Sequence, residues 1–278
     1  MLKQYLKRKI KKRLIDFLKE YTEERAGLVQ YQKDFEQILS YAISGLFPDS
    51  CDCHKNGEYI NLKKFIDNYK DENITVFDVG ANIGNYSKDI IEICKYKKLK
   101  LHCFEPSKNN FKLLQSNLNC YNATLNNFGL SDKKEKLVLY KDKPETPLAS
   151  VYQRKLAHYS IDLSIKEEIE LSTLDDYCYE NNIYKIDLLK IDTEGHEFKV
   201  LQGSTKMLDH GKIKAIQFEF GGTNIDARTY FKDFWYLLND KYQIYKMVKD
   251  GLFEITHYNE QREIFIYANF FLLLKETL

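Results

Sequence analysis

Short apolar runs alternate with helical stretches along the chain from residue 73 onward. Five of these runs are continuous and six to eight residues long, which is typical of strands buried on both faces of a sheet. They are ITVFDV, LKLHCF, ATLNNF, IDLLKI and IKAIQFEF. The stretches with helical spacing are YSKDIIEICKY, KNNFKLLQSNL, TLDDYCYENN and HEFKVLQGSTKML. This alternation predicts right-handed βαβ crossovers and an α/β fold with a doubly wound parallel sheet.

The first 70 residues have a different pattern, which predicts a helical extension (1–70) ahead of a larger domain (71–278). Apolar residues recur every three or four positions in the first twenty residues, at Leu2, Leu6, Ile10, Leu14 and Phe17/Leu18. Eight basic and two acidic residues share this segment, so we expect a basic amphipathic helix. Such a helix packs on its own domain, forms a homodimer, or lies on an anionic membrane surface.

A break in the helical pattern, GLFPDSCDCHKNGEY, contains Cys51, Cys53 and His54. These residue types bind zinc, but a structural zinc site usually takes four ligands in paired spacings. No second pair is visible in the sequence, so we interpret the break as a turn and predict no metal site there.

Composition narrows the protein class. The chain has 278 residues, 44% of them hydrophobic, and only four prolines, which is ordinary for a folded protein and argues against disorder. No apolar run approaches the roughly 20 residues of a spanning helix, and the first residues lack the apolar core of a signal peptide. The six scattered cysteines are expected to be reduced thiols. We therefore expect a cytoplasmic protein, or a peripheral one at the inner face of the membrane, and the net charge of +1 does not favour nucleic acid as a partner.

The first predicted strand runs into a polar turn, VFDVGANIGN, with glycines at 80 and 84. A strand that turns sharply into a helix needs glycine where φ is positive or where the backbone approaches a ligand. A dinucleotide-binding loop would read G-x-G-x-x-G, but Asn82 and Asn85 replace its second and third glycines. This disfavours a nicotinamide-dependent oxidoreductase, and the absence of G-K-[ST] excludes a P-loop.

Glu105 ends the second predicted strand, 25 residues beyond Gly80. A carboxylate at this point can accept hydrogen bonds from both hydroxyls of a ribose, although Ser107 nearby is also a plausible helix cap. The glycine turn and the acidic strand end together suit an adenosine ligand without a pyrophosphate. S-adenosylmethionine has that chemistry, with a ribose, an adenine, an amino-acid tail and a sulfonium cation.

The ordered set of motifs resembles the S-adenosylmethionine-dependent methyltransferases of the FkbM family, from about Ile74 to Leu274. The matching pieces are VFDVGANIGNYS, FEPSKNNFKLLQSN, NNFGLSD, STLDDY, IDLLKIDTEGHEFKVLQG and IQFEF. The resemblance implies a class I methyltransferase (Rossmann-like) sheet of seven strands, the last of them antiparallel. NEQREIFIYANFFLLLK is expected to supply that last strand.

The resemblance also implies a binding site for S-adenosylmethionine. The residues expected along its methionine part and at the helix start are Asp78, Gly80, Asn82, Gly84, Asn85 and Tyr86. The residues expected around its ribose and adenine are Glu105, Pro106, Ser107, Asn127, and Ser131 or Asp132. Asn127 and Asp132 fit ordinary turn chemistry equally well.

The acceptor chemistry is expected in KIDTEGHE, at the end of the fourth predicted strand. Asp192 closes that strand, where it can stabilise the sulfonium or orient an acceptor hydroxyl, and acids there also complement a helix dipole. His196 is the expected general base because a neutral imidazole can take a proton near pH 7, with Asp192 and Glu219 as competitors. The reaction requires no metal, although Asp192, Glu219 and a neighbouring histidine are residue types that can hold Mg²⁺.

The resemblance implies methyl transfer to oxygen, often to a sugar hydroxyl in surface or capsular glycans or glycosylated natural products. Residues 141–166 form a polar excursion expected to cover the cleft, and its Arg154 and Lys155 can meet the phosphates of a nucleotide-linked sugar. The aromatic residues of RTYFKDFWYLL either contact a sugar or, more simply, fill a helix core. We therefore predict a sugar O-methyltransferase. The alternatives are a non-sugar small-molecule hydroxyl as acceptor, and a non-catalytic module anchored to a membrane or a partner.

Overall fold

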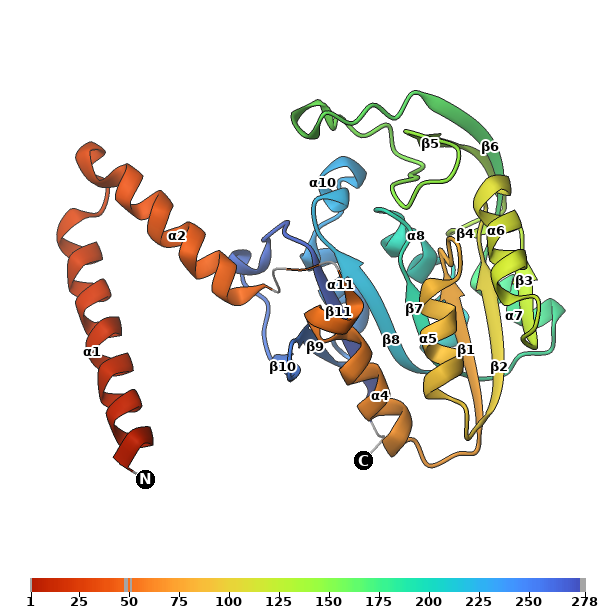
Figure 1. Ribbon diagram of the computed structural model, residues 1–278, viewed down its shortest axis with the longest axis horizontal. Helices are drawn as coiled ribbons and strands as arrows, with labels where there is room; N and C mark the ends of the chain where they lie inside the picture. The colour runs from red at the N-terminus through yellow and green to blue at the C-terminus, as the bar shows by residue number, and fades with distance from the viewer. Residues whose placement is uncertain (1, 48–49, 51, 276–278) are drawn as a thin grey trace. The chain divides into compact units, whose positions relative to one another are not determined.

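The chain forms two compact units, Met1–Phe47 and Pro48–Leu278. The computed structural model in Figure 1 describes residues 2–47, 50 and 52–275. Within these residues, no helix combines the length and the apolar character that crossing a bilayer requires.

The first unit is helical, as predicted. It contains α1 (Leu2–Arg25), the 3₁₀ turn η1 (Val29–Tyr31) and α2 (Gln32–Leu46). Tyr21 joins the two helices: its hydroxyl donates a hydrogen bond to Asp34 (3.0 Å), and its ring contacts Phe35. The side chains of Ile10, Leu14 and Phe17 on α1 are exposed. The side chains of Leu2 and Leu6, the other members of the predicted apolar stripe, lie outside the described residues.

The second unit begins well before the predicted boundary at residue 70. It opens with α3 (Cys53–Asn56) and α4 (Glu58–Asn68). Leu62 and Ile66 of α4 are 1% exposed and belong to the main hydrophobic core. Gln217 donates a hydrogen bond to the buried Glu58 (2.6 Å). The helical pattern of α4 resembles that of the extension, but these contacts make α4 part of the larger unit.

An eight-stranded sheet forms the centre of the second unit. Its strands are β1 (Asn73–Val79), β2 (Lys98–Phe104), β3 (Ala123–Asn126), β7 (Ile186–Ile191), β8 (Ile213–Phe220), β9 (Tyr242–Val248), β10 (Gly251–Ile255) and β11 (Ala268–Leu274). The order is β10-β9-β11-β8-β7-β1-β2-β3, and β11 runs antiparallel to both of its neighbours. All five predicted strands are present, and the antiparallel strand falls where it was expected.

The prediction of seven strands was one short for the residues described. The eighth, β10, pairs antiparallel with β9 as an edge hairpin. The hairpin turns at Lys249–Asp250, the two residues between the paired Val248 and Gly251. With seven strands in the order β3-β2-β1-β7-β8-β11-β9 and one added at the edge, the sheet is that of a class I methyltransferase.

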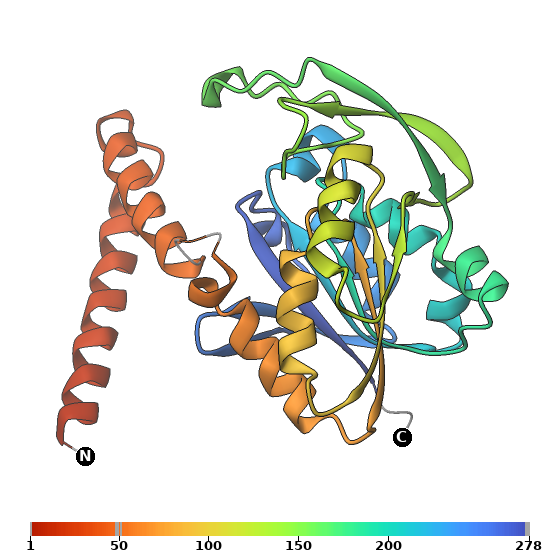
Figure 2. The same cartoon turned by 45° about the vertical axis from the view of Figure 1, so that its right-hand side comes forward.

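Helices cover both faces of the sheet, so the doubly wound prediction is confirmed (Figure 2). They are α4, α5 (Asn85–Ile93), α6 (Lys108–Leu118), α7 (Leu174–Glu180), α8 (Glu197–Gln202), α9 (Thr205–Asp209), α10 (Thr223–Ala227) and α11 (Phe231–Leu238). Successive residues of a strand point to opposite faces. Val76 accordingly lies in the core shared with α4, α5 and α6, whereas Phe77 contacts Tyr177 of α7.

A second, three-stranded sheet was not predicted. Its order is β4-β6-β5, with β4 (Gly129–Leu130), β5 (Glu135–Lys141) and β6 (Ile165–Ser172). Leu139, Ile169 and Leu171 form its own small core. Glutamates alternate with the apolar residues of β6, and on β5 charged residues flank only the short run LVLY, so neither strand resembles the longer apolar runs of the large sheet. Residues 142–164, here called the covering loop, connect β5 to β6 and pass over one end of the large sheet (Figures 1 and 2).

Candidate functional site

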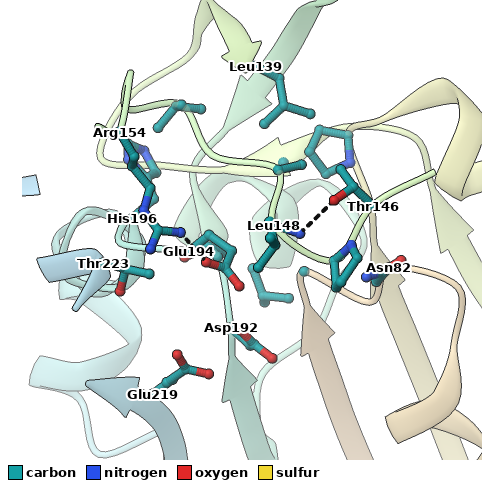
Figure 3. Close-up of a pocket in the computed structure, with 18 of the residues that line it drawn as sticks. Asn82, Leu139, Thr146, Leu148, Arg154, Asp192, Glu194, His196, Glu219 and Thr223 are labelled. Carbon is teal, nitrogen blue, oxygen red and sulfur yellow. Dashed lines mark hydrogen bonds and ion pairs between the residues drawn. The ribbon is translucent and has the colours of Figure 1, made fainter. Parts of the chain in front are cut away.

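A cavity of about 670 Å³ opens at the carboxyl ends of β1, β2, β7 and β8, beneath the covering loop (Figure 3). This is the edge at which parallel α/β sheets bind ligands, and the volume lies within the usual range for ligand pockets. Seven predicted site residues line it: Gly80, Asn82, Glu105, Pro106, Asp192, His196 and Glu219. The structure therefore brings four of the predicted donor-binding residues and all three predicted catalytic residues together around one space.

The two glycines of the turn between β1 and α5 serve chain packing. Gly80 has φ +81°, and a Cβ atom there would overlap the carbonyl oxygen of Asp192. Gly84 has φ +88°, and a Cβ atom there would lie 2.8 Å from a methyl carbon of Leu114. Both positions thus require glycine for the protein's own close contacts. The sequence had left open whether a ligand or the backbone imposes this requirement.

Glu105 holds the turn against the start of α6. One carboxylate oxygen accepts a hydrogen bond from the backbone N–H of Asn82, and the other accepts from the N–H of Ser107, each at 2.9 Å. Burial raises the pKa of Glu105 to about 7, although these two hydrogen bonds act in the opposite direction. Because each carboxylate oxygen has a second lone pair, Glu105 can still accept hydrogen bonds from hydroxyls in the cavity. The residue therefore fits a ribose.

The other predicted donor-site residues lie outside the cavity lining. They are Asp78, Gly84, Asn85, Tyr86, Ser107, Asn127 and Asp132. The amide of Asn127 donates to the carbonyl oxygen of Glu105 (2.9 Å), and Asp132 pairs with Lys199 (2.7 Å). Tyr86 donates to Gln217 (3.1 Å). These contacts support the loops that carry the lining residues.

Lys190, which the sequence analysis did not single out, lies beneath the cavity and pairs with two of the predicted site residues. It is 5% exposed, and its ammonium lies 3.2 Å from Asp78 and 3.3 Å from Asp192. Burial alone would lower the pKa of Lys190, but Asp192 and Asp78 raise it above its ordinary value. The side chain therefore stays charged beneath the cavity. A lysine inside the apolar strand IDLLKI was the available signal, because lysine is almost never buried without a partner.

Glu194 connects the end of β7 to the covering loop. Its backbone adopts φ +53°, an unusual conformation for a residue other than glycine. Arg154 donates to its carboxylate (2.8 Å), and Ser150 donates to its carbonyl oxygen (2.8 Å). Arg154 also lies 3.4 Å from Asp226. The covering loop is thus fastened to the strand-end turn by both a side chain and the backbone.

Three carboxylates from two strand ends face the cavity: Asp192, Glu194 and Glu219 (Figure 3). Burial and the charge of Asp192 raise the pKa of Glu194 to about 8. Burial, then Asp192 and Glu194, raise the pKa of Glu219 well above its ordinary value. Burial and mutual repulsion therefore keep part of this cluster protonated at neutral pH. Such a cluster can stabilise a cation and can exchange a proton with a ligand.

His196, the predicted general base, is buried with both ring nitrogens occupied. Nε2 lies 2.9 Å from the hydroxyl oxygen of Ser131, and Nδ1 lies 3.1 Å from that of Tyr152. Burial lowers the pKa of His196 to about 4, so the ring is neutral at pH 7. The imidazole can take a proton from a ligand only after one of these hydrogen bonds breaks.

The aromatic residues of RTYFKDFWYLL divide between core and surface. Phe231 and Phe234 are each 1% exposed and pack against Phe220 of β8, as the core interpretation predicted. Tyr230 is exposed. Lys155, proposed from sequence as a phosphate contact, is exposed on the covering loop and lies outside the cavity lining.

Comparison with known proteins identifies the family. The sequence profile described as "Methyltransferase FkbM domain" matches residues 78–246. The chain is 25% identical over 167 residues to Methyltransferase 1 of Beauveria bassiana (strain ARSEF 2860), which covers 52% of this chain and 66% of that protein. The chain therefore spans just under two thirds of this relative.

Two solved structures are more distant. Methyltransferase FkbM from Methylobacillus flagellatus KT is 17% identical, with a TM-score of 0.45 over 73% of this chain and 44% of that one. Precorrin-6y C5,15-methyltransferase from Geobacter metallireducens GS-15 is 9% identical, with a TM-score of 0.40 over 78% of this chain and 87% of that one. The assignment depends on the profile match, which spans more than half of the sequence. The chain belongs to the FkbM methyltransferase family.

Proposed function

We propose that the protein is an S-adenosylmethionine-dependent O-methyltransferase that acts on a hydroxyl of a sugar, either nucleotide-linked or part of a surface glycan. One observation carries the proposal. The glycine turn after β1, the carboxylate of Glu105 and the three carboxylates Asp192, Glu194 and Glu219 line a single cavity. A donor and an acceptor bound there would lie side by side.

The donor half is supported by the chemistry of the lining. Glu105 offers a carboxylate to the two hydroxyls of a ribose, and Pro106 with Leu130 provides an apolar surface for an adenine. Asp192 lies across the turn from Gly80 and offers a negative charge where a sulfonium would sit. When bound, S-adenosylmethionine supplies a methyl group on a sulfonium that an acceptor oxygen can attack in line.

The residues of this chain align the acceptor hydroxyl and accept the proton that it loses. We favour Glu219 as the base. The positive charge of a sulfonium nearby would lower the pKa of the Glu219 carboxyl group, so that the group becomes ionised and can accept a proton. Asp192 is then available to orient the attacking hydroxyl. Alignment of the two reactants should supply most of the rate enhancement, and a base a further roughly 10²–10⁴-fold.

A polyhydroxyl acceptor suits the remaining lining. Carboxylates and the hydroxyl of Thr223 can hydrogen-bond several hydroxyls, and Leu148 of the covering loop points toward Asp192 from above (Figure 3). The one arginine of the lining, Arg154, is already paired with Glu194 and Asp226. A nucleotide-linked sugar would therefore have to place its phosphates at the exposed rim, for instance near Lys155.

The donor half is tested by calorimetric titration of the purified protein with S-adenosylmethionine, with NAD as a parallel ligand. We expect S-adenosylmethionine alone to bind, and Glu105→Gln to weaken binding by at least tenfold. Glutamine keeps the size of the side chain, and Glu254→Gln on the exposed strand β10 serves as the control. Absence of binding would favour the alternative of a non-catalytic module.

The acceptor half is tested by mass spectrometry. Sugar nucleotides, oligosaccharides and non-sugar small-molecule alcohols are incubated with the donor, and a mass increase of one methyl group is sought. Glu219→Gln should retain donor binding and lose transfer by about 10²-fold or more. Methylation of non-sugar alcohols alone would contradict the sugar assignment and leave the donor assignment intact.

A further inference from the structure

Three metal-ligand side chains meet on the face of the second unit that carries α5. They are Cys53 and His54 of α3 and Asp89 of α5. The thiol sulfur of Cys53 lies 3.4 Å from one carboxylate oxygen of Asp89, and Nε2 of His54 lies 3.7 Å from the other. The three ligand atoms lie within 4.8 Å of one another. Among the described residues, no other group of this kind gathers its ligand atoms so closely.

The 3.4 and 3.7 Å separations are close to those around a tetrahedral metal ion. Zinc binds sulfur at about 2.3 Å and nitrogen or oxygen at about 2.0–2.2 Å, which places neighbouring ligand atoms roughly 3.3–3.6 Å apart. Cysteine, histidine and aspartate are all zinc ligands, and the fourth position, which a side chain fills in most structural zinc sites, is left here to a water molecule. The side chain of His54 is 56% exposed, so an ion has a route to the cluster and the ring can turn toward it.

The surroundings hold the ligands in place. The ring of His54 packs on Tyr59 of α4, with 4.5 Å between ring centroids. Asp52 caps α3 by accepting a hydrogen bond from the backbone N–H of His54 (3.0 Å). Asp89 is fixed on α5, the helix that follows the glycine turn of the cavity. The cluster is thus oriented by neighbours that are not themselves metal ligands.

We propose that Cys53, His54 and Asp89 bind one divalent transition-metal ion, with Zn²⁺ as the expected ion, and that the ion fastens the start of the second unit to α5. The sequence predicted only a turn here, because Asp89 lies 35 residues beyond His54 and completes the set only in the folded chain. The site is separate from the cavity, so we assign the ion a role in holding α3 against α5 rather than in methyl transfer. Cys51, the other cysteine of that break, lies outside the described residues and is not included.

Cobalt substitution tests the site without relying on activity. The full chain is stripped with a chelator and titrated with Co²⁺, and the near-ultraviolet absorption of a cobalt–thiolate bond is recorded. We expect this band to saturate at one ion per chain and Zn²⁺ to displace it. Cys53→Ser should abolish the band, and His54→Ala and Asp89→Asn should each weaken Co²⁺ binding by at least tenfold. Zn²⁺ should also raise the Tm of the wild type.

Matched variants test whether another thiol produces the cobalt–thiolate band, and whether unfolding causes its loss. Cys120→Ser removes an exposed thiol elsewhere and should leave the band unchanged. Cys51→Ser should keep it as well. Far-UV circular dichroism confirms that each variant is folded, and His54→Ala, which changes an exposed side chain, remains informative if another variant unfolds. Absence of a thiolate band, or a band that persists in Cys53→Ser, overturns the proposal.

Discussion

Lys190 and Asp78 form an ion pair inside the large sheet, with 3.2 Å between the ammonium nitrogen and a carboxylate oxygen. Their strands, β7 and β1, are adjacent and parallel, and the two residues are partners in the pairing register. Asp78 is fully buried, and the hydroxyl of Ser87 donates to its second oxygen (2.7 Å). The pair lies directly below the cavity, so the charge that neutralises Asp78 also holds Asp192.

Removal of this buried cation should destabilise the fold. Lys190→Met leaves Asp78 without its ionic partner, and we expect the free energy of unfolding to fall by about 3–5 kcal/mol. Urea denaturation measures the change. The double variant Lys190→Met with Asp78→Asn should recover part of the loss, because it removes the uncompensated charge. Additive losses would show that the two side chains are not coupled.

Gly80 should be intolerant of alanine for a reason independent of any ligand. The added Cβ would overlap the carbonyl oxygen of Asp192, and φ is +81°. We expect Gly80→Ala to lose at least about 3 kcal/mol in urea denaturation of the ligand-free protein. Gly222→Ala is the control, because its Cβ would meet open space. Normal stability of Gly80→Ala would contradict this packing account.

The stability of the protein should depend on pH through Glu105. Its pKa is about 7 in the folded protein, above the ordinary value of 4.5, so the folded state binds the proton more tightly than the unfolded state. The resulting stabilisation is present below pH 4.5 and is lost as the pH rises through 7, at a cost of about 3 kcal/mol. Urea denaturation between pH 5 and 8 should therefore show a smaller decline for Glu105→Gln than for the wild type. Equal declines would mean that the carboxyl titrates normally.

Arg154 should control the acceptor side of the reaction. Its hydrogen bond to Glu194 fastens the covering loop over the cavity, and such charged bonds contribute about 1.5–3 kcal/mol. Arg154→Ala should lower kcat/KM for the acceptor by at least about tenfold and leave the Kd of the donor nearly unchanged. Lys155→Ala changes an exposed neighbour and should have little effect on a small neutral acceptor. A comparable loss of donor affinity in Arg154→Ala would assign the loop to the donor instead.

The parallel strands and most helices followed from periodicity alone. KNNFKLLQSNL coincides with α6, and the five apolar runs all became strands of the large sheet, because apolar spacing reflects which side chains face the core. Periodicity failed where burial depends on distant partners. On β5, Val138 is exposed beside the buried Leu139. The charged residues that flank them made this strand, which covers the site, hard to recognise from the sequence.

The sequence indicated which types of residue line the candidate site, but not what role each side chain has there. The positions of Glu105, Asp192 and Glu219 at strand ends predicted that they share one edge of the sheet, and all three line the cavity. The occupied nitrogens of His196 depend on Ser131 and Tyr152, 65 and 44 residues away, and no local pattern records such contacts. The role of a side chain follows from its neighbours in space, which a single sequence does not give.

We propose that the basic helix α1 binds an anionic membrane surface. Its exposed Ile10 and Phe17 can enter the interface, and its lysines can meet acidic headgroups. Cosedimentation with phosphatidylserine vesicles, but not with neutral ones, should detect binding that salt weakens. Replacement of Lys7, Lys11 and Lys12 by glutamine should weaken it about 100-fold, at about 1 kcal/mol per lysine.

A control set removes three exposed lysines from the second unit. Glutamine at Lys95, Lys98 and Lys100 gives the same change in net charge and should leave vesicle binding intact. Equal losses in the two sets would indicate non-specific attraction. A homodimer detected by ultracentrifugation in the absence of lipid, and lost when α1 is altered, would instead support subunit packing by this helix.

The covering loop begins after Lys141 and ends before Ile165, and these two residues are paired across β5 and β6. Its ends are therefore held one strand spacing apart, whatever the length of chain between them. Closure of a longer loop costs little additional entropy, so loops of other lengths and sequences can replace this segment between the same two strands. Grafting the covering loop from one family member onto another should transfer substrate preference. Glu105 and the turn at Gly80 would stay unchanged in the recipient protein.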